Sequence, residues 1–196
     1  SLGRSDPVTD GMTTPISAPR RGRLLVATPQ LEDPNFRRSV VLLLDHGEEG
    51  SLGVILNRPS EVPAERILPG WTESGGSTPR VFSGGPVQTN SLIALAPTSA
   101  IWRASTPITE QIALLDLEED LEISPEDLGK VCLYLGYSGW SSGQLQAELE
   151  EGAWWTFESD PADLFSDPSQ SWTSVLSRQN SAARLVAFHP DHSYLN

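Results

Sequence analysis

Short apolar runs separated by turn-forming residues dominate the pattern of hydrophobic and polar positions along the chain. Residues 39–44 form a continuous apolar run, which is typical of a strand covered on both faces. The polar segment 45–50 leads from this run into the apolar residues 52–56, so we expect a β-hairpin there. Further strands are expected at residues 23–27, 80–82, 92–96, 111–115, 131–135 and 154–157.

Helical signals are fewer and lie mostly after the middle of the chain. Ser60 is expected to cap a short helix over residues 62–68. Other expected helices are a short turn capped by Ser124, a turn after Asp160, and a helix over residues 169–178 with Trp172, Val175 and Leu176 on one face. Strands and hairpins followed by a few helices predict a single α+β domain, with a curved or mixed sheet wrapped around two main helices.

The segment 136–145 contains a strong helix-start signal. Ser141 and Gln144 have the spacing of a capping box, in which each side chain bonds the other residue's backbone amide. Trp140 and Leu145 then occupy the two positions of a hydrophobic staple. We therefore expect a helix over residues 142–151.

The same segment also invites a catalytic interpretation. Gly136-Tyr137-Ser138-Gly139 follows an apolar strand, as a nucleophile elbow does, and acids and histidines follow it along the chain. The elbow pattern needs a glycine at position 140, where this sequence has Trp140. We therefore predict no catalytic residue here and favour packing roles for the segment.

Length and composition indicate one domain over residues 22–196, preceded by a disordered tail over residues 1–21 that is rich in proline and polar residues. Neither a membrane span nor the apolar part of a secretory signal is visible in the sequence. Cys132 is the single cysteine and lies in an apolar run, which favours a buried, inert thiol and a reducing compartment. We expect a cytoplasmic protein.

The net charge of −13 is concentrated in the second half of the chain, which carries −12 after residue 100. Arg20, Arg21 and Arg23 form the densest basic patch. Binding of DNA depends on neutralising phosphates, so direct nucleic-acid recognition is disfavoured.

Several polar residues are candidates for a ligand pocket. His46 lies in an acidic turn, but no second histidine or cysteine is close enough in sequence to complete a metal site, and we predict no metal or cofactor. Arg58 is well placed to bind a carboxylate or phosphate, or to form a structural salt bridge. Gly84-Gly85-Pro86 indicates either an anion-binding loop or a tight turn. The candidate pocket consists of His46, Asn57, Arg58, Gly84, Gly85 and Glu148.

Several segments together resemble the YqgE/AlgH family of bacterial proteins. They are residues 22–29, 33–36 and 38–40, His46, Gly50, Gly53, residues 57–59 and 82–87, Gly136 to Trp140, residues 143–145, and Glu148. The resemblance implies an α+β fold with coiled, bifurcated sheets around two core helices. Members of the AlgH type are described as transcriptional regulators, but the family has no agreed activity and no established catalytic residues. The acidic segment 118–127 and the N-terminal tail are particular to this chain.

Three functions remain open at this point. We expect a non-enzymatic binding or regulatory protein that acts through a protein or small-molecule partner, away from membranes. The alternative is a hydrolase-like enzyme with a pocket near His46 and Arg58. A regulator that binds DNA directly comes third, because the net charge opposes it.

Overall fold

The computed structural model describes residues 18–69, 78–100, 102, 104–117, 123–179 and 183–188. Most of the expected N-terminal tail, the acidic stretch 118–120 and the last eight residues lie outside the described part. Residues 18–21 are described, and within them Arg20 pairs with Glu158.

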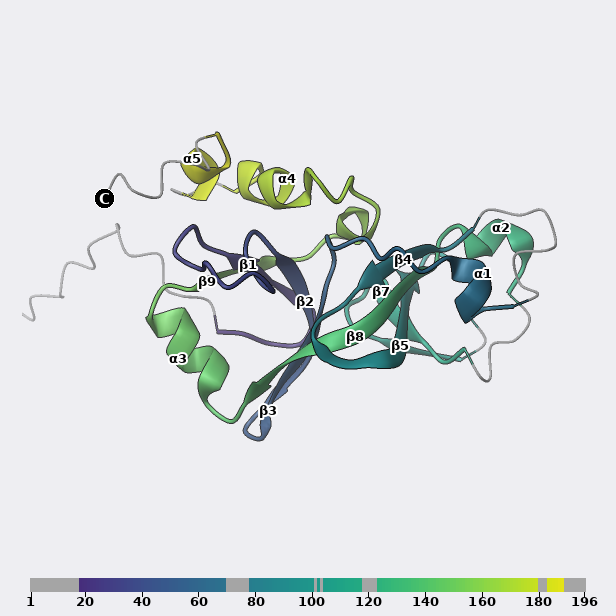
Figure 1. The fold of residues 1–196 in the computed structure, drawn as a ribbon, viewed down its shortest axis with the longest axis horizontal. Helices are drawn as coiled ribbons and strands as arrows, with labels where there is room; N and C mark the ends of the chain where they lie inside the picture. The colour runs from purple at the N-terminus through teal and green to yellow at the C-terminus, as the bar shows by residue number, and fades with distance from the viewer. Residues whose placement is uncertain are drawn as a thin grey trace, which may run out of the picture.

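One curled, mostly antiparallel sheet forms the body of the protein (Figure 1). Its strands follow the order β6-β7-β5-β8-β3-β2-β1-β9, and β4 pairs with β8 in parallel. The strands are β1 (Arg23–Ala27), β2 (Val40–Gly47), β3 (Gly50–Ile55), β4 (Arg80–Ser83), β5 (Val87–Pro97), β6 (Ser105–Pro107), β7 (Ile112–Leu115), β8 (Cys132–Ser141) and β9 (Trp154–Glu158). The expected α+β class is therefore confirmed at the level of a mixed, curled sheet with several helices.

The described helices are α1 (Ala64–Ile67), α2 (Pro125–Leu128), α3 (Gln144–Glu150), α4 (Ser171–Ser177) and α5 (Ala183–Phe188), with a 3-10 turn η1 at Pro161–Leu164. No helix within the described ranges has the length and hydrophobicity needed to cross a membrane. The detail of two core helices is not confirmed, because α3, α4 and α5 all bury side chains in the core.

Strands β1 and β2 are covered on both faces, as was predicted for residues 39–44. Alternate residues such as Leu24 and Leu42 face α4 and α5, whereas Leu25 and Leu43 face α3. All four side chains are fully buried. Because successive side chains of a strand point to opposite faces, β1 and β2 contribute to a separate apolar cluster on each face of the sheet. The predicted hairpin β2–β3 is also confirmed, with a turn at residues 48–49.

Strand β8 is twice as long as predicted and connects the two parts of the sheet. Its first half, Cys132 to Leu135, pairs with β4 and β5, and its second half, Ser138 to Ser141, pairs with β3. The segment Gly136–Trp140 therefore lies inside a strand rather than in a turn that starts a helix. The prediction of a strand ending at Leu135 was wrong, because pairing with β3 outweighs the turn preference of the two glycines.

The sheet divides along β8, where its neighbour changes from β4 to β3. Glycines at this point allow the backbones of the Gly84-Gly85 loop and β8 to approach each other closely. The Gly84 amide donates to the Leu135 carbonyl at 2.8 Å, and the Gly84 carbonyl accepts from the Ile55 amide at 2.9 Å. A Cβ on Gly85 would overlap the Tyr137 backbone, and one on Gly136 would overlap the Gly85 carbonyl. The alternatives for Gly84-Gly85-Pro86 were an anion-binding loop and a tight turn with close backbone approach. The structure shows the close backbone approach.

Helix α3 starts two residues later than predicted, and its start uses part of the expected capping box. Gln144 Oε1 accepts from the Ser141 amide at 2.9 Å, but the N-cap is Gly143 in the left-handed conformation and no side chain caps it. Trp140 and Leu145 are both buried in the cluster beneath α3, as a staple requires. Similarly, α1 begins after Pro63, and Ser60 does not cap it.

Candidate functional site

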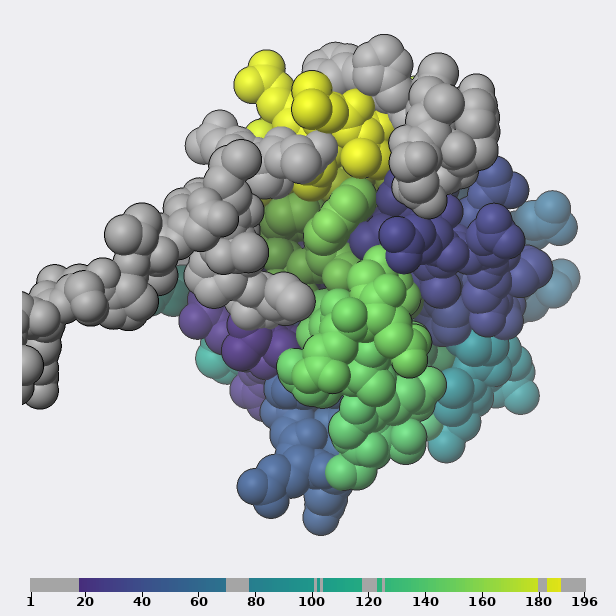
Figure 2. All heavy atoms as spheres, turned by 90° about the vertical axis from the view of Figure 1, so that its left-hand side faces the viewer, coloured from purple at the N-terminus to yellow at the C-terminus, as the bar shows by residue number. Residues whose placement is uncertain are grey.

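A groove of about 490 Å³ lies between the tip of the β2–β3 hairpin and the start of α3. Figure 2 shows these two elements side by side, with α3 in green and the hairpin tip in blue. The groove is lined by His46, Gly47, Glu48, Gly50, Ser51, Ser141, Ser142, Gly143, Leu145 and Gln146. It is thus built from two segments that are almost a hundred residues apart in sequence.

Strand pairing brings these two segments together. His46 lies opposite Ser51 in the hairpin, and Gly50 lies opposite Ser141 where β3 pairs with β8. The Gly50 backbone has a φ of 138°, and a Cβ there would overlap the Trp140 carbonyl. Glycine at position 50 is therefore needed for the hairpin to close against β8.

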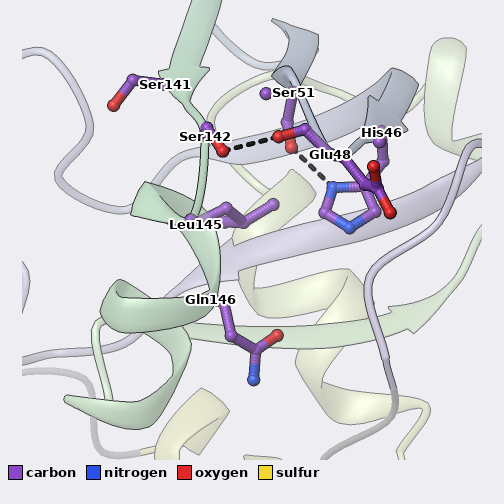
Figure 3. A pocket seen from close by; sticks show the side chains of 10 residues that line it. His46, Glu48, Ser51, Ser141, Ser142, Leu145 and Gln146 are labelled. Carbon is purple, nitrogen blue, oxygen red and sulfur yellow. Dashed lines mark hydrogen bonds between the residues drawn. The ribbon is translucent and has the colours of Figure 1, made fainter.

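Hydrogen bonds hold both walls of the groove (Figure 3). His46 Nδ1 and Ser51 Oγ are 2.6 Å apart. Across the groove, the Ser142 hydroxyl donates to the Glu48 carbonyl at 2.5 Å. This second bond ties the turn of the hairpin to the residues that precede α3, so the groove has a fixed width at that end.

Gly47 is the lining residue whose identity the fold does not explain. A Cβ at this position would meet nothing within 4 Å, and the φ of Gly47 lies outside the left-handed region. Neither packing nor backbone conformation therefore requires glycine here. The absent side chain leaves space at this end of the groove.

The structure does not bring the six predicted pocket residues into one pocket within its described part. Of the six, His46 lines the groove. Asn57 is buried at the far end of β3, where Oδ1 accepts from the Val40 amide and Nδ2 donates to the Arg38 carbonyl, each at 2.9 Å. At about 3.3 Å per extended residue, Arg58 is roughly 20 Å from the His46–Ser51 pair.

The guanidinium of Arg58 makes a structural contact with the backbone. Its Nη2 donates to the Arg37 carbonyl. Partial burial lowers the pKa of Arg58 from its ordinary value. Its own carbonyl accepts from the Ser83 amide at 2.7 Å, which places it beside the Gly84-Gly85 loop. Asn57, Arg58 and the two glycines thus form one structural neighbourhood, away from the groove.

Glu148 lies on α3 and faces an aromatic cluster. Its Oε1 accepts from Trp154 Nε1 at 3.2 Å, and its Oε2 is buried without a hydrogen-bond partner among the described residues. Trp154 in turn packs against Phe36 and Trp140, with ring centroids 5.8 and 5.9 Å away. The predicted site residue Glu148 therefore helps to hold α3 against the aromatic cluster.

Ser138 and Cys132 have structural surroundings. Ser138 is fully buried, and its hydroxyl donates to the Gly84 carbonyl at 3.1 Å. Burial raises the pKa of Cys132 to about 12, and its thiol donates to the Leu164 carbonyl at 3.4 Å. Across the described ranges, no three His, Cys, Asp or Glu side chains are grouped closely enough to hold a metal ion.

Sequence reasoning missed the opposite wall of the groove, at Ser141, Ser142 and Gln146. No hydrophobic alternation was available as a signal, because the buried positions of this stretch are Gly136, Ser138 and Trp140. The strand is set by its pairing with β3, which places Ser141 opposite Gly50.

Comparisons with known proteins agree on one family. The model of the AlgH-like family matches residues 24–184. A UPF0301 protein of Streptomyces avermitilis is 48% identical over 185 residues, which covers 89% of this chain and 94% of the relative. A UPF0301 protein of Thermobifida fusca is 39% identical, with the same coverage of both chains.

Solved structures are similar over most of the chain. A crystal structure of a Corynebacterium diphtheriae protein has a TM-score of 0.78 and 27% identity, covering 88% of this chain and 94% of that one. The solution structure of AlgH from Pseudomonas aeruginosa has a TM-score of 0.64 and 31% identity, covering 84% and 88%. With a family model that spans residues 24–184 and close relatives of nearly equal length, the chain belongs to the AlgH-like family.

Proposed function

We propose that this chain is a non-enzymatic regulatory protein that binds a partner protein in the groove between the β2–β3 hairpin and α3. The observation that carries the proposal is the free space at Gly47, in a groove whose two walls are tied together by the hydrogen bond from Ser142 to the Glu48 carbonyl. We place its action in the cytoplasm, since its single cysteine fits a reducing compartment.

The shape of the groove favours a protein segment over an enclosed small molecule. Gly47 and Glu48 on the hairpin are exposed, as are Ser141 to Gly143 and Gln146 on the other wall. Small-molecule sites usually bury most of the surface of their ligand. An open groove with exposed serine, glutamine and backbone groups is better suited to a polar loop, which keeps one side in solvent.

Leu145 lines the groove but is only 1% exposed, so its side chain supports the groove from beneath and is not available to a partner. Contacts with a partner loop would therefore be made by the exposed residues of the two walls.

One contact supports the hydrolase-like alternative. The 2.6 Å separation of His46 Nδ1 and Ser51 Oγ is within reach for proton transfer from a nucleophilic serine. However, His46 and Ser51 are directly opposite in an antiparallel pair, and such cross-strand neighbours bond without any catalytic role. Arg58, which the alternative also needs, lies at the other end of β3. The enzyme is therefore the second candidate.

The test uses a side chain that fills the groove. Gly47→Trp introduces a large side chain where a Cβ meets nothing, so the fold should tolerate it while the groove is blocked. Asn90→Trp adds the same side chain at an exposed position on β5 and is the matched control. Each variant is used as bait in cell extract of the source organism, and captured proteins are quantified by mass spectrometry.

We expect the intact chain and Asn90→Trp to capture the same partner, and Gly47→Trp to lose it. Equal capture by all three baits would contradict the groove as the binding site. If the enzyme candidate is correct, the intact chain should hydrolyse ester substrates and Ser51→Ala should abolish this turnover. Our proposal predicts no turnover by the intact chain.

A further inference from the structure

A second pocket, distinct from the groove, lies where the residues before β1 meet the β6–β7 turn and the end of β9. It has a volume of about 370 Å³ and shares no lining residue with the groove. Its lining includes Arg20, Arg21, Arg23, Thr109, Glu110 and Glu158. The densest basic patch of the sequence is therefore not scattered over the surface but collected around one pocket.

Close packing at Gly22 holds the arginines against the β6–β7 turn. Gly22 has a φ of 88°, and a Cβ there would stand 2.6 Å from Thr109 Cγ2. Its amide donates to the Leu43 carbonyl at 2.8 Å, and its carbonyl accepts from the Ser159 hydroxyl at 2.6 Å. The backbone between Arg21 and Arg23 is thus fixed from three sides, which positions both side chains at the pocket.

Arg23 forms the buried wall of this pocket. It is 8% exposed, and it donates from Nη1 to Glu158 Oε1 at 2.6 Å and from Nη2 to the Thr156 carbonyl at 3.3 Å. Its Nε is buried and has no hydrogen-bond partner within the described part of the chain. This Nε is out of reach of solvent, so the donors open to an incoming anion are those of Arg20 and Arg21, which are exposed.

Glu158 only partly balances the positive charge. Its Oε1 accepts from both Arg23 and Arg20, the latter at 2.8 Å. Arg21 uses Nε on the Leu44 carbonyl at 3.2 Å and has no ion pair with Glu158. Three guanidinium groups therefore face two carboxylates, those of Glu158 and Glu110, in a chain whose net charge is −13. The pocket has an excess positive charge where the rest of the molecule is acidic.

We propose that this pocket binds a phosphate group, either free or as a small monoester. Arginine forks match the oxygen geometry of phosphate, and two of the three arginines are exposed and accessible to it. The Thr109 hydroxyl, at the pocket wall, accepts from the Ile112 amide at 2.9 Å and retains its own proton to donate. The acidity of the remaining surface excludes long polyanions and leaves compact anions as ligands.

The experiment is calorimetric titration of the full chain at low ionic strength, with inorganic phosphate in one arm and O-phosphoserine in the other. We expect binding of one equivalent of at least one probe, weakened by added salt. A tighter constant for O-phosphoserine would assign the site to monoesters, and a tighter constant for inorganic phosphate would assign it to the free ion. The absence of binding by both would overturn the proposal.

Variants separate this site from a general charge effect. Arg21→Gln and Arg20→Gln should each weaken binding about tenfold or more, because each removes a charged donor. Arg66→Gln removes the same charge at an exposed position on α1 and should leave affinity unchanged. An equal loss in Arg66→Gln would overturn the proposal. Unfolding midpoints of all variants establish that they are folded.

Glu158→Gln gives a test of opposite sign. Removing the carboxylate that Arg20 and Arg23 share frees two guanidinium groups for the anion, so phosphate affinity should rise. If the arginines only had the role of fixing β9 to β1, the same substitution would lower stability without raising affinity. Unchanged or weaker phosphate binding in Glu158→Gln would contradict the proposed site.

Discussion

Gly47 and Gly85 differ in what surrounds them, and this difference makes a prediction. A Cβ at Gly85 would overlap the Tyr137 backbone, and its φ of 153° is at the edge of the region that favours glycine. Gly85→Ala should therefore lower the free energy of unfolding by about 3 kcal/mol. Gly47→Ala should change it by less than about 0.5 kcal/mol. Denaturant unfolding of both variants measures this, and equal losses would contradict the structural assignment of the two glycines.

Asn57 provides a second prediction at this scale. Its side chain accepts from the Val40 amide and donates to the Arg38 carbonyl, and Asn57→Ala removes both bonds. We expect a loss of about 1–3 kcal/mol in unfolding free energy, because the buried Val40 amide loses its acceptor. The exposed Asn90→Ala is the control. A loss no larger than that of the control would contradict the structural role of Asn57.

The thiol of Cys132 gives a prediction with a pH dependence. Burial raises its pKa from 9.0 to about 12, so the folded chain favours the neutral thiol. This contribution to stability is complete below pH 9 and is lost as pH rises from 9 towards 12, at up to about 1.4 kcal/mol per pH unit. Cys132→Ser should reduce this slope in unfolding experiments. A thiol reagent should modify the intact chain only after unfolding, and rapid modification of the folded chain would contradict the burial.

At the scale of elements, the sequence pattern predicted what local periodicity controls. The run predicted at residues 39–44 lies in β2, which begins at Val40 and is buried on both faces there, and Trp172, Val175 and Leu176 form the buried face of α4. The second half of β8 was missed because its glycines suit a turn. The strand there depends on pairing with β3, which is distant in sequence.

The candidate site follows the same rule. His46 was found because a histidine in a polar turn is visible in the sequence. Ser142 and Gln146 were not, because their position opposite His46 depends on how β8 leads into α3. Arg58 and Glu148 do not line the groove with His46, and motifs along the chain carry no information on which end of a strand a residue occupies.

The end of α3 gives a prediction that belongs to the element. The Ala153 amide donates to the Glu148 carbonyl at 2.9 Å and the Gly152 amide donates to the Leu149 carbonyl at 3.1 Å, which is a Schellman motif with Gly152 at φ 79°. Gly152→Ala should cost about 1 kcal/mol of unfolding free energy, through left-handed strain. No change on denaturant unfolding would show that this motif does not stabilise α3.

At the scale of the whole molecule, the net charge bears on whether the chain could regulate genes by binding DNA directly or through another protein. With a net charge of −13, the chain should not retard DNA in a gel even at low salt, because few cations are available to replace counterions. Any regulatory action on genes would then pass through the protein partner. Retardation at low salt that weakens as salt rises would contradict this.

The central claim is that the groove at the hairpin tip binds a partner. Isotope-labelled full-length chain, titrated with unlabelled extract of the source organism, reports the contact surface through its backbone amide resonances. We predict shifts or broadening concentrated at residues 46–51 and 141–146, and their absence in Gly47→Trp. Changes concentrated on β5 to β7, or unaffected by Gly47→Trp, would contradict the account.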